Sequence, residues 1–127
     1  MKKLLLIQII LIIVISCNIN DDINSSSEIN YKQEMRNFVI GISEYGKSNN
    51  ERLIIIPQNG IELITINGEE DGLPHSSYLD AIDANGQEDF FYGYVKDNQA
   101  TSTNDNSYLQ IFLDKSKNHG NVCSQTE

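Results

Sequence analysis

A short apolar run in the middle of the chain constrains the fold more than any other feature of the sequence. Leu53 to Ile56 is continuous, rich in isoleucine and free of polar alternation, which favours a strand covered on both faces of a parallel sheet. Parallel strands are joined by crossover segments of a dozen or more residues, usually helices. The run therefore predicts an α/β fold. Pro57 follows Ile56 directly and ends the run.

Segments with helical periodicity lie on both sides of this run. Residues 31–48 predict a helix with one apolar stripe, formed by Tyr31, Met35, Phe38, Val39, Ile42 and Tyr45. Residues 76–86 predict a short helix that ends at a glycine. Residues 101–120 predict a further helix, with Tyr108, Ile111, Phe112 and Lys115 on one face.

A second strand is predicted at the aromatic segment "DFFYGY", residues 89–94. The order is then helix, strand, helix, strand, helix, with spacings typical of βαβ units. Two strands make a poor sheet, because a sheet needs cover on its faces and its edges. We therefore expect the folded region to be one part of a larger architecture.

The N-terminal segment "MKKLLLIQIILIIVISC" indicates a secretory signal with a basic start and a short apolar run. Val14 to Cys17 resemble a bacterial lipobox, in which the cysteine is lipidated. We expect residues 1–16 to be a lipoprotein signal peptide and residues 17–30 a lipidated Cys17 with a flexible tether. The predicted location is the bacterial cell envelope, at the outer surface or the periplasmic face. The alternative is a membrane-spanning anchor, although the apolar run is shorter than the roughly 20 residues that spanning requires.

The charge of the chain excludes nucleic acid as an expected partner. The formal net charge is −9, and removing Lys2 and Lys3 with the signal would leave seven basic and 18 acidic residues, a net charge of −11. Nucleic-acid binding relies on clustered Lys and Arg. Such a surface would attract a cationic polymer, for example a partly deacetylated amino-sugar chain. The alternative is that the acidity only keeps the protein soluble.

Four segments resemble the later part of a known enzyme family. They are "NYKQEMRNFVIGISEYGKS", "LIIIPQNGIELITINGEEDG", "YLDAIDANGQEDFFYGY" and "SYLQIFLDKSKNHG". Their order and motifs are similar to the endo-α-1,4-polygalactosaminidase-like glycoside hydrolases, extracellular (β/α)8 barrel proteins once labelled as related to cysteinyl-tRNA synthetase. The resemblance implies that residues 31–120 are a partial TIM barrel of about two βα units. Residues 121–127 are expected to be a disordered tail.

The resemblance also assigns residues to a carbohydrate site. Gln58 and Asn59 follow the first strand, and the carboxyl ends of barrel strands form the catalytic mouth. Amides donate and accept at once, which suits sugar hydroxyls. Glu88 is the implied catalytic carboxylate, as acid/base or nucleophile. Asp89, Tyr92 and Tyr94 are implied to contact substrate. The alternative is that Glu88 is a solvated loop acid and the tyrosines are barrel packing.

The functional prediction is limited by a missing carboxylate. A glycosidase of either stereochemistry needs two, and the resemblance places the second on an earlier strand that has no counterpart here. We therefore predict an amino-sugar polysaccharide hydrolase that is truncated and inactive alone, with a complementing barrel half or self-association as partner. The alternative is a non-catalytic surface lipoprotein that binds a carbohydrate or a host partner. No cofactor and no metal are expected, because His75, His119 and Cys123 lack the spacing of ligands or of a catalytic group.

Overall fold

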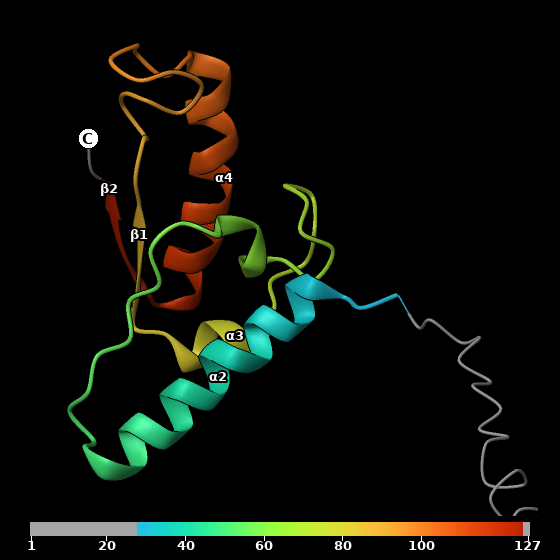
Figure 1. The fold of residues 1–127 in the computed structure, drawn as a ribbon, viewed down its shortest axis with the longest axis vertical. Helices are drawn as coiled ribbons and strands as arrows, with labels where there is room; N and C mark the ends of the chain where they lie inside the picture. Colours follow the sequence, from blue (N-terminus) through green and yellow to red (C-terminus); the bar gives the residue numbers. More distant parts are fainter. Residues whose placement is uncertain (1–27, 126–127) are drawn as a thin grey trace, which may run out of the picture.

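The computed structural model describes residues 28–125, and it has a mixed α/β fold. The predicted signal peptide, Cys17 and most of the predicted tether lie outside the described residues. The helices and strands are α2 (Tyr31–Asn49), the 3-10 helix η1 (Ile61–Ile64), α3 (Ser76–Ala81), β1 (Ala84–Gln87), α4 (Thr103–His119) and β2 (Val122–Gln125). Figure 1 shows α4 lying along the two strands, and α2 crossing α3.

The sheet of the described residues has two parallel strands, which confirms the predicted α/β class. β1 pairs with β2 from Ala84 opposite Val122 to Gln87 opposite Gln125, and α4 connects the two. The predicted disordered tail is therefore wrong for residues 122–125, which form β2. The backbone N–H of Val122 also donates to the carbonyl of Asp83, at 3.1 Å, so the backbone hydrogen bonds between the two segments begin one residue before β1.

The predicted strand Leu53 to Ile56 is not a strand, although the segment from Ile55 to Pro57 lies beside β1 and bonds to it. Asp83 donates to the carbonyl of Ile55 at 2.9 Å and Gly86 donates to that of Pro57 at 3.0 Å. Pro57 has no N–H to return a bond. On the other edge, Ile54 and Ile56 form no backbone hydrogen bond within residues 28–125, and both side chains are exposed. The run therefore forms an open edge rather than the covered strand that its composition predicts.

The predicted strand at residues 89–94 is wrong as well. Asp89 and Gly93 both have positive φ, 56° and 100°, which breaks an extended conformation at two points. The residues form a loop in which Phe90 enters the core. The strand lies instead at β1, whose Asn and Gly have little intrinsic strand preference.

Helix α2 is present as predicted, but its apolar stripe points to solvent. The exposed members are Tyr31, Met35, Phe38, Ile42 and Tyr45. The helix instead buries Arg36 and Ser43 against η1 and α3. Ser43 Oγ donates to the carbonyl of Ala81, 2.5 Å away, at the end of α3. Polar contacts with carbonyls therefore decide which face of α2 meets the core.

The hydrophobic core lies between α4, η1 and α3. Its buried members are Ile61, Ile64, Tyr78, Leu79, Ile82, Phe90, Leu109, Phe112 and Leu113. The predicted face of α4 is partly confirmed, since Phe112 is fully buried whereas Ile111 is exposed.

Ser102 caps α4 by accepting from the N–H of Asp105, and Gly120 ends it with φ 111°, a left-handed conformation suited to glycine. α3 ends five residues earlier than predicted, which frees Gly86 for β1.

Candidate functional site

The amide pair after the apolar run lies beside the end of β1. Gln58 forms a parallel bridge with Gly86, and the N–H of Asn59 donates to the carbonyl of Gly86 at 2.8 Å. Asn59 and Gly60 then take successive left-handed conformations, with φ 61° and 63°. Asparagine and glycine tolerate that region better than other residues. The turn therefore leads the chain away from β1 and holds both amide side chains at the carboxyl end of β1.

Both amides converge on the carboxylate of Glu88. Gln58 Nε2 donates to Glu88 Oε1, and Asn59 Nδ2 donates to Glu88 Oε2 at 3.2 Å. In return, the backbone N–H of Glu88 donates to Asn59 Oδ1 at 3.0 Å. The structure thus brings together three of the residues that the sequence assigned to the site.

The arrangement holds a carboxylate in place while leaving it open to a ligand. All three side chains are exposed, and each carboxylate oxygen has further lone pairs beyond the one that an amide occupies. Amide oxygens and nitrogens beside a carboxylate can pair with groups that both donate and accept, such as hydroxyls. The donors and acceptors of this site are thus complementary to those of a hydroxyl group.

A small cavity of about 210 Å³ opens beside these residues. It is lined by Asn59, Gly60, Ile61, Glu62, Gln87, Asp89, Tyr94 and Leu109. Asp89 and Tyr94 thus share one hollow with Asn59, as expected for neighbouring site residues. Glu88 itself is not among the lining residues.

Glu62 belongs to this cavity, and the sequence analysis missed it. It lies in the first turn of η1, directly after the turn at Asn59 and Gly60. Burial is the main cause of the raised pKa of Tyr94, and the nearby carboxylates of Glu62 and then Asp105 raise it further. Burial and then Glu62 likewise raise the pKa of Tyr108. The one signal in the sequence was a single acid within an otherwise apolar turn.

Tyr92 lies in a different hollow from Tyr94. That hollow is lined by Asp89, Tyr92, Gly93, Asp97 and Asn98. Tyr92 also bridges to Ala100 across the loop, so its backbone belongs to the loop before α4. The structure therefore separates the two tyrosines that the sequence assigned to one substrate surface, while Asp89 lines both hollows.

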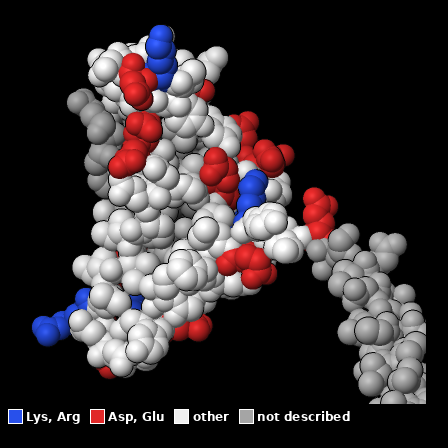
Figure 2. Space-filling model, viewed as in Figure 1, with Lys and Arg blue, Asp and Glu red and all other residues white. Residues whose placement is uncertain are grey.

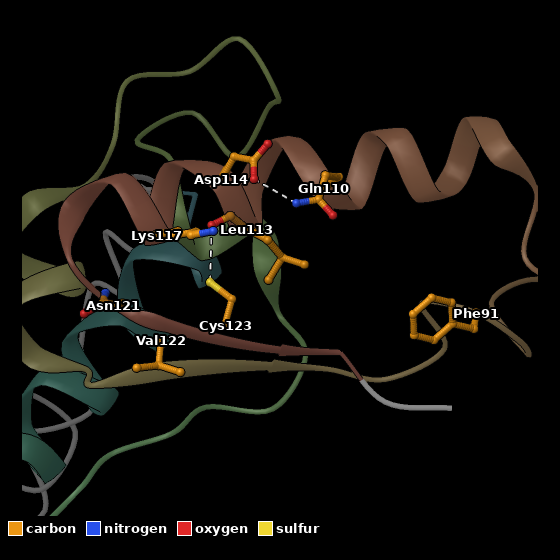
Figure 3. Close-up of a pocket in the computed structure, with 8 residues that line it drawn as sticks. All are labelled: Phe91, Gln110, Leu113, Asp114, Lys117, Asn121, Val122 and Cys123. Atoms are coloured by element: carbon orange, nitrogen blue, oxygen red, sulfur yellow. Dashed lines mark hydrogen bonds between the residues drawn. The ribbon is translucent and has the colours of Figure 1, made fainter.

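The hollow shown in Figure 3 lies beside α4 and β2 and contains none of the predicted site residues. Cys123 lines it, and its thiol donates to the carbonyl of Leu113 at 3.3 Å. Burial is the main cause that raises the pKa of the Cys123 thiol, which keeps it protonated at neutral pH. A protonated thiol is a weaker nucleophile than a thiolate.

Residues 28–125 give no sign of a metal centre. Within that range, no three side chains of His, Cys, Asp and Glu gather closely enough to hold an ion. The same range contains no helix with the length and apolar character needed to cross a membrane. Figure 2 shows acidic side chains spread over one face of the molecule, with fewer basic ones.

Comparison with protein-family models gives no match for this sequence, and comparison with curated proteins gives none either. The glycoside hydrolase resemblance therefore stays a prediction.

Proposed function

We propose that this protein is a lipid-anchored, extracytoplasmic member of a glycoside hydrolase barrel family that binds an amino-sugar polysaccharide and is inactive alone. The observation that carries the proposal is the convergence of Gln58 and Asn59 on Glu88. Active sites of α/β barrels lie at the carboxyl ends of the strands, and glycosidases use carboxylates for their chemistry.

The overall acidity of the chain supports a cationic carbohydrate. The chain carries 18 acidic and nine basic residues. A polymer with free amino groups would gain long-range attraction to such a protein, and its hydroxyls would pair with the amides. Tyr94, beside the site, offers a ring face on which a sugar could stack.

The described fold supports the idea that the chain forms only part of a barrel. The edge at Ile54 and Ile56 has unpaired backbone groups within the described residues, and the apolar stripe of α2 is uncovered. A neighbouring strand and helix would cover both. A complementing barrel half would supply them, and it would also supply a second catalytic carboxylate.

Binding of amino-sugar oligosaccharides tests the proposal. We expect a galactosamine oligomer to bind the protein in a calorimetric titration, and Glu88→Gln to weaken it about tenfold, as loss of one charged hydrogen-bonding partner does. Glu51→Gln is the matched control, since Glu51 is exposed in the turn after α2. Equal affinity of all three proteins would refute the site, and no binding by the unmodified protein would refute the function.

A second candidate function is a surface lipoprotein that binds a partner without chemistry. The uncovered stripe of α2 favours it, because large exposed apolar patches mark interaction sites. The DNA beside the coding region separates the two candidates. A barrel half encoded next to this chain would support the enzyme fragment, whereas its absence would favour the binding protein.

A further inference from the structure

We propose that copies of this chain assemble head to tail. Residues 53–57 and helix α2 of one copy cover the outer edge of β2 and the hollow beside α4 of the next copy. The partner is thus a second copy of this chain, and the assembly does not depend on carbohydrate binding.

The parallel sheet ends in two different edges that can pair with each other. Residues 53–57 run parallel to β1, as the bridge between Gln58 and Gly86 shows, and β2 runs parallel to β1 on its other side. The described part of the chain contains no further strand beyond either edge. Joining one edge to the other edge of a second copy continues the sheet with all strands parallel. Joining two identical edges would instead reverse the strand direction or put the helices on opposite faces.

The backbone groups of the two edges are suited to such pairing. Ile54 and Ile56 form no backbone hydrogen bond in the described part of the chain, and they alternate with residues that bond to the β1 side. On β2, the N–H of Val122 points to the β1 side, so the backbone groups of the next residue, Cys123, point to the outer edge. Each edge therefore offers both donors and acceptors to the other.

An apolar surface lies on the helical side of each edge. Beside residues 53–57 it is the exposed stripe of α2, which stays available because Ser43 bonds to α3 from another face of the helix. Beside β2 it is the hollow in Figure 3, with a volume of about 620 Å³. Apolar side chains of its lining include Phe91, Leu113 and Val122.

The order of the elements brings the stripe of one copy to the hollow of the next. α2 leads into residues 53–57, as α4 leads into β2. Ile55 and Cys123 both pack against the hydrophobic core, so the helices lie on the same side of the sheet at both edges. A copy that adds its residues 53–57 to the outer edge of β2 therefore places its own α2 beside α4, over the hollow.

Charge does not oppose this contact, although the whole chain has a formal net charge of −9. The exposed members of the stripe are uncharged, and the hollow is lined by one acid, Asp114, and one base, Lys117. Two copies thus meet where their mutual repulsion is smallest. The same net charge disfavours an anionic lipid surface as the occupant of the stripe.

A head-to-tail contact does not stop at two copies. A dimer of this kind keeps a free stripe at one end and a free hollow at the other. The unmodified chain therefore forms assemblies larger than a dimer, as a closed ring or an open array. A symmetric contact of stripe with stripe would stop at the dimer.

Mixing two differently disabled variants tests the head-to-tail contact. Phe38→Lys disables the stripe and Val122→Lys disables the edge of β2, and the two side chains are 63% and 67% exposed. The full 127-residue chain is used in nonionic detergent, with micelles in excess over protein, and its assembly is measured by sedimentation. We expect each variant alone to need a concentration about tenfold or more higher to assemble. An equimolar mixture should form dimers and nothing larger, because the intact stripe of one variant fits the intact hollow of the other.

The controls place the same charge elsewhere on the surface. Glu44→Lys and Val95→Lys change exposed positions outside the stripe and the hollow, and both should assemble like the unmodified chain. Association of Val122→Lys on its own, with no gain on mixing, would overturn the inference in favour of a stripe-to-stripe dimer. A monomeric unmodified chain or a monomeric mixture would overturn it as well.

Cross-linking replaces the lysine variants should either of them not fold. In a full chain with Cys17→Ala and Phe38→Cys, a short bismaleimide should join position 38 to Cys123 of the next copy and give a ladder of multimers. Glu44→Cys in place of Phe38→Cys is the matched control and should give none. Absence of the ladder, or equal yield after Cys123→Ala, would overturn the inference. No carbohydrate is present in either experiment, so their outcomes are separate from the binding test at Glu88.

Discussion

The carboxylate of Asp83 accepts a hydrogen bond from the backbone N–H of Ile55, with 2.8 Å between Oδ2 and the nitrogen. The same carboxylate pairs with Lys47, whose Nζ lies 3.0 Å from Oδ2 and 3.1 Å from Oδ1. Asp83 directly precedes β1, and Lys47 lies in the last turn of α2. One side chain thus joins the helix, the open edge and the sheet.

Asp83 should make stability depend on pH in the acid range. Its pKa is lowered from 3.8, first by the Ile55 hydrogen bond and then by Lys47. A carboxylate whose pKa is lower in the folded state than in the unfolded state stabilises the fold when the pH is above its unfolded pKa. That stabilisation is lost as the pH falls through 3.8 toward the lower pKa of the folded state. We expect Asp83→Asn to cost about 0.5–1 kcal/mol at pH 7, a figure kept low because the side chain is 39% exposed.

The measurement is chemical denaturation of Asp83→Asn and the unmodified protein at pH 7 and pH 3. The difference between the two proteins should shrink at the lower pH. Glu51→Gln serves as the control, since this acid is exposed in the turn after α2. A difference that stays constant over this range would show that Asp83 stabilises the fold through its shape and not its charge.

The buried guanidinium of Arg36 is expected to be the most sensitive position on α2. It is 1% exposed, and it donates to the carbonyls of Leu63 at 2.9 Å and Thr65 at 2.5 Å. Arg36→Met would keep the apolar stem but leave the Leu63 carbonyl without this donor and the Thr65 carbonyl with the N–H of Gly68 alone, at a cost of about 2–3 kcal/mol. Arg52→Met, at an exposed arginine, should change the free energy of unfolding by less than about 0.5 kcal/mol. Similar effects of the two substitutions would contradict this role.

The sequence predicted the helices better than it predicted the strands or the buried face of each helix. The period of three and four residues identified α2, because periodicity reports a helix whatever covers it. The apolar stripe did not identify the buried face, because Arg36 and Ser43 bond to distant carbonyls on the face that meets the core. β1 escaped prediction because "ANGQ" gains its extended form from pairing with β2.

The site was predicted where polar residues directly followed an apolar run. Gln58 and Asn59 stand out there, and the convergence on Glu88 puts them in contact with a residue 29 and 30 positions away. Glu62 and Gln87 were missed for opposite reasons. Glu62 was hidden inside an apolar turn, and the burial of Gln87 is a tertiary property that no local pattern carries.

The exposed stripe of α2 predicts self-association of a soluble form that starts at Asn18. Phe38 is 63% exposed and Ile54 64%, and Leu53 packs over Gly46, so the helix and the open edge both present apolar side chains to solvent and are in contact with each other. Phe38→Lys should shift the sedimentation profile toward monomer. Glu44→Lys, an exposed position of the same helix outside the stripe, should not. A monomeric unmodified protein with a sharp, reversible thermal transition would contradict this prediction.

The lipid anchor can be tested independently of the fold. Because Val14 to Cys17 follow an apolar run, we expect the protein to incorporate labelled palmitate in bacterial cells and to partition into the detergent phase. Cys17→Ala should lose both properties, whereas Cys123→Ala should keep them. Label retained in Cys17→Ala would refute the lipobox assignment.

Catalysis depends on where a second carboxylate lies relative to Glu88. Either glycosidase geometry places the two carboxylates about 5–10 Å apart across the sugar. The carboxylate of Glu88 is held by Gln58 and Asn59, whereas Glu62 and Asp89 line a cavity to which Glu88 does not contribute.

We therefore predict no detectable hydrolysis of polygalactosamine by this chain alone, as measured by release of reducing ends. A complete barrel that carries these segments should lose most of its activity on Glu88→Gln, about a hundredfold or more for a catalytic acid or base. Asp97→Asn, in the separate hollow with Tyr92, should leave that activity within about twofold. Robust turnover by the 127-residue chain, abolished by Glu88→Gln, would show that a partner carboxylate already lies within the chain, with Glu62 and Asp89 the first positions to substitute.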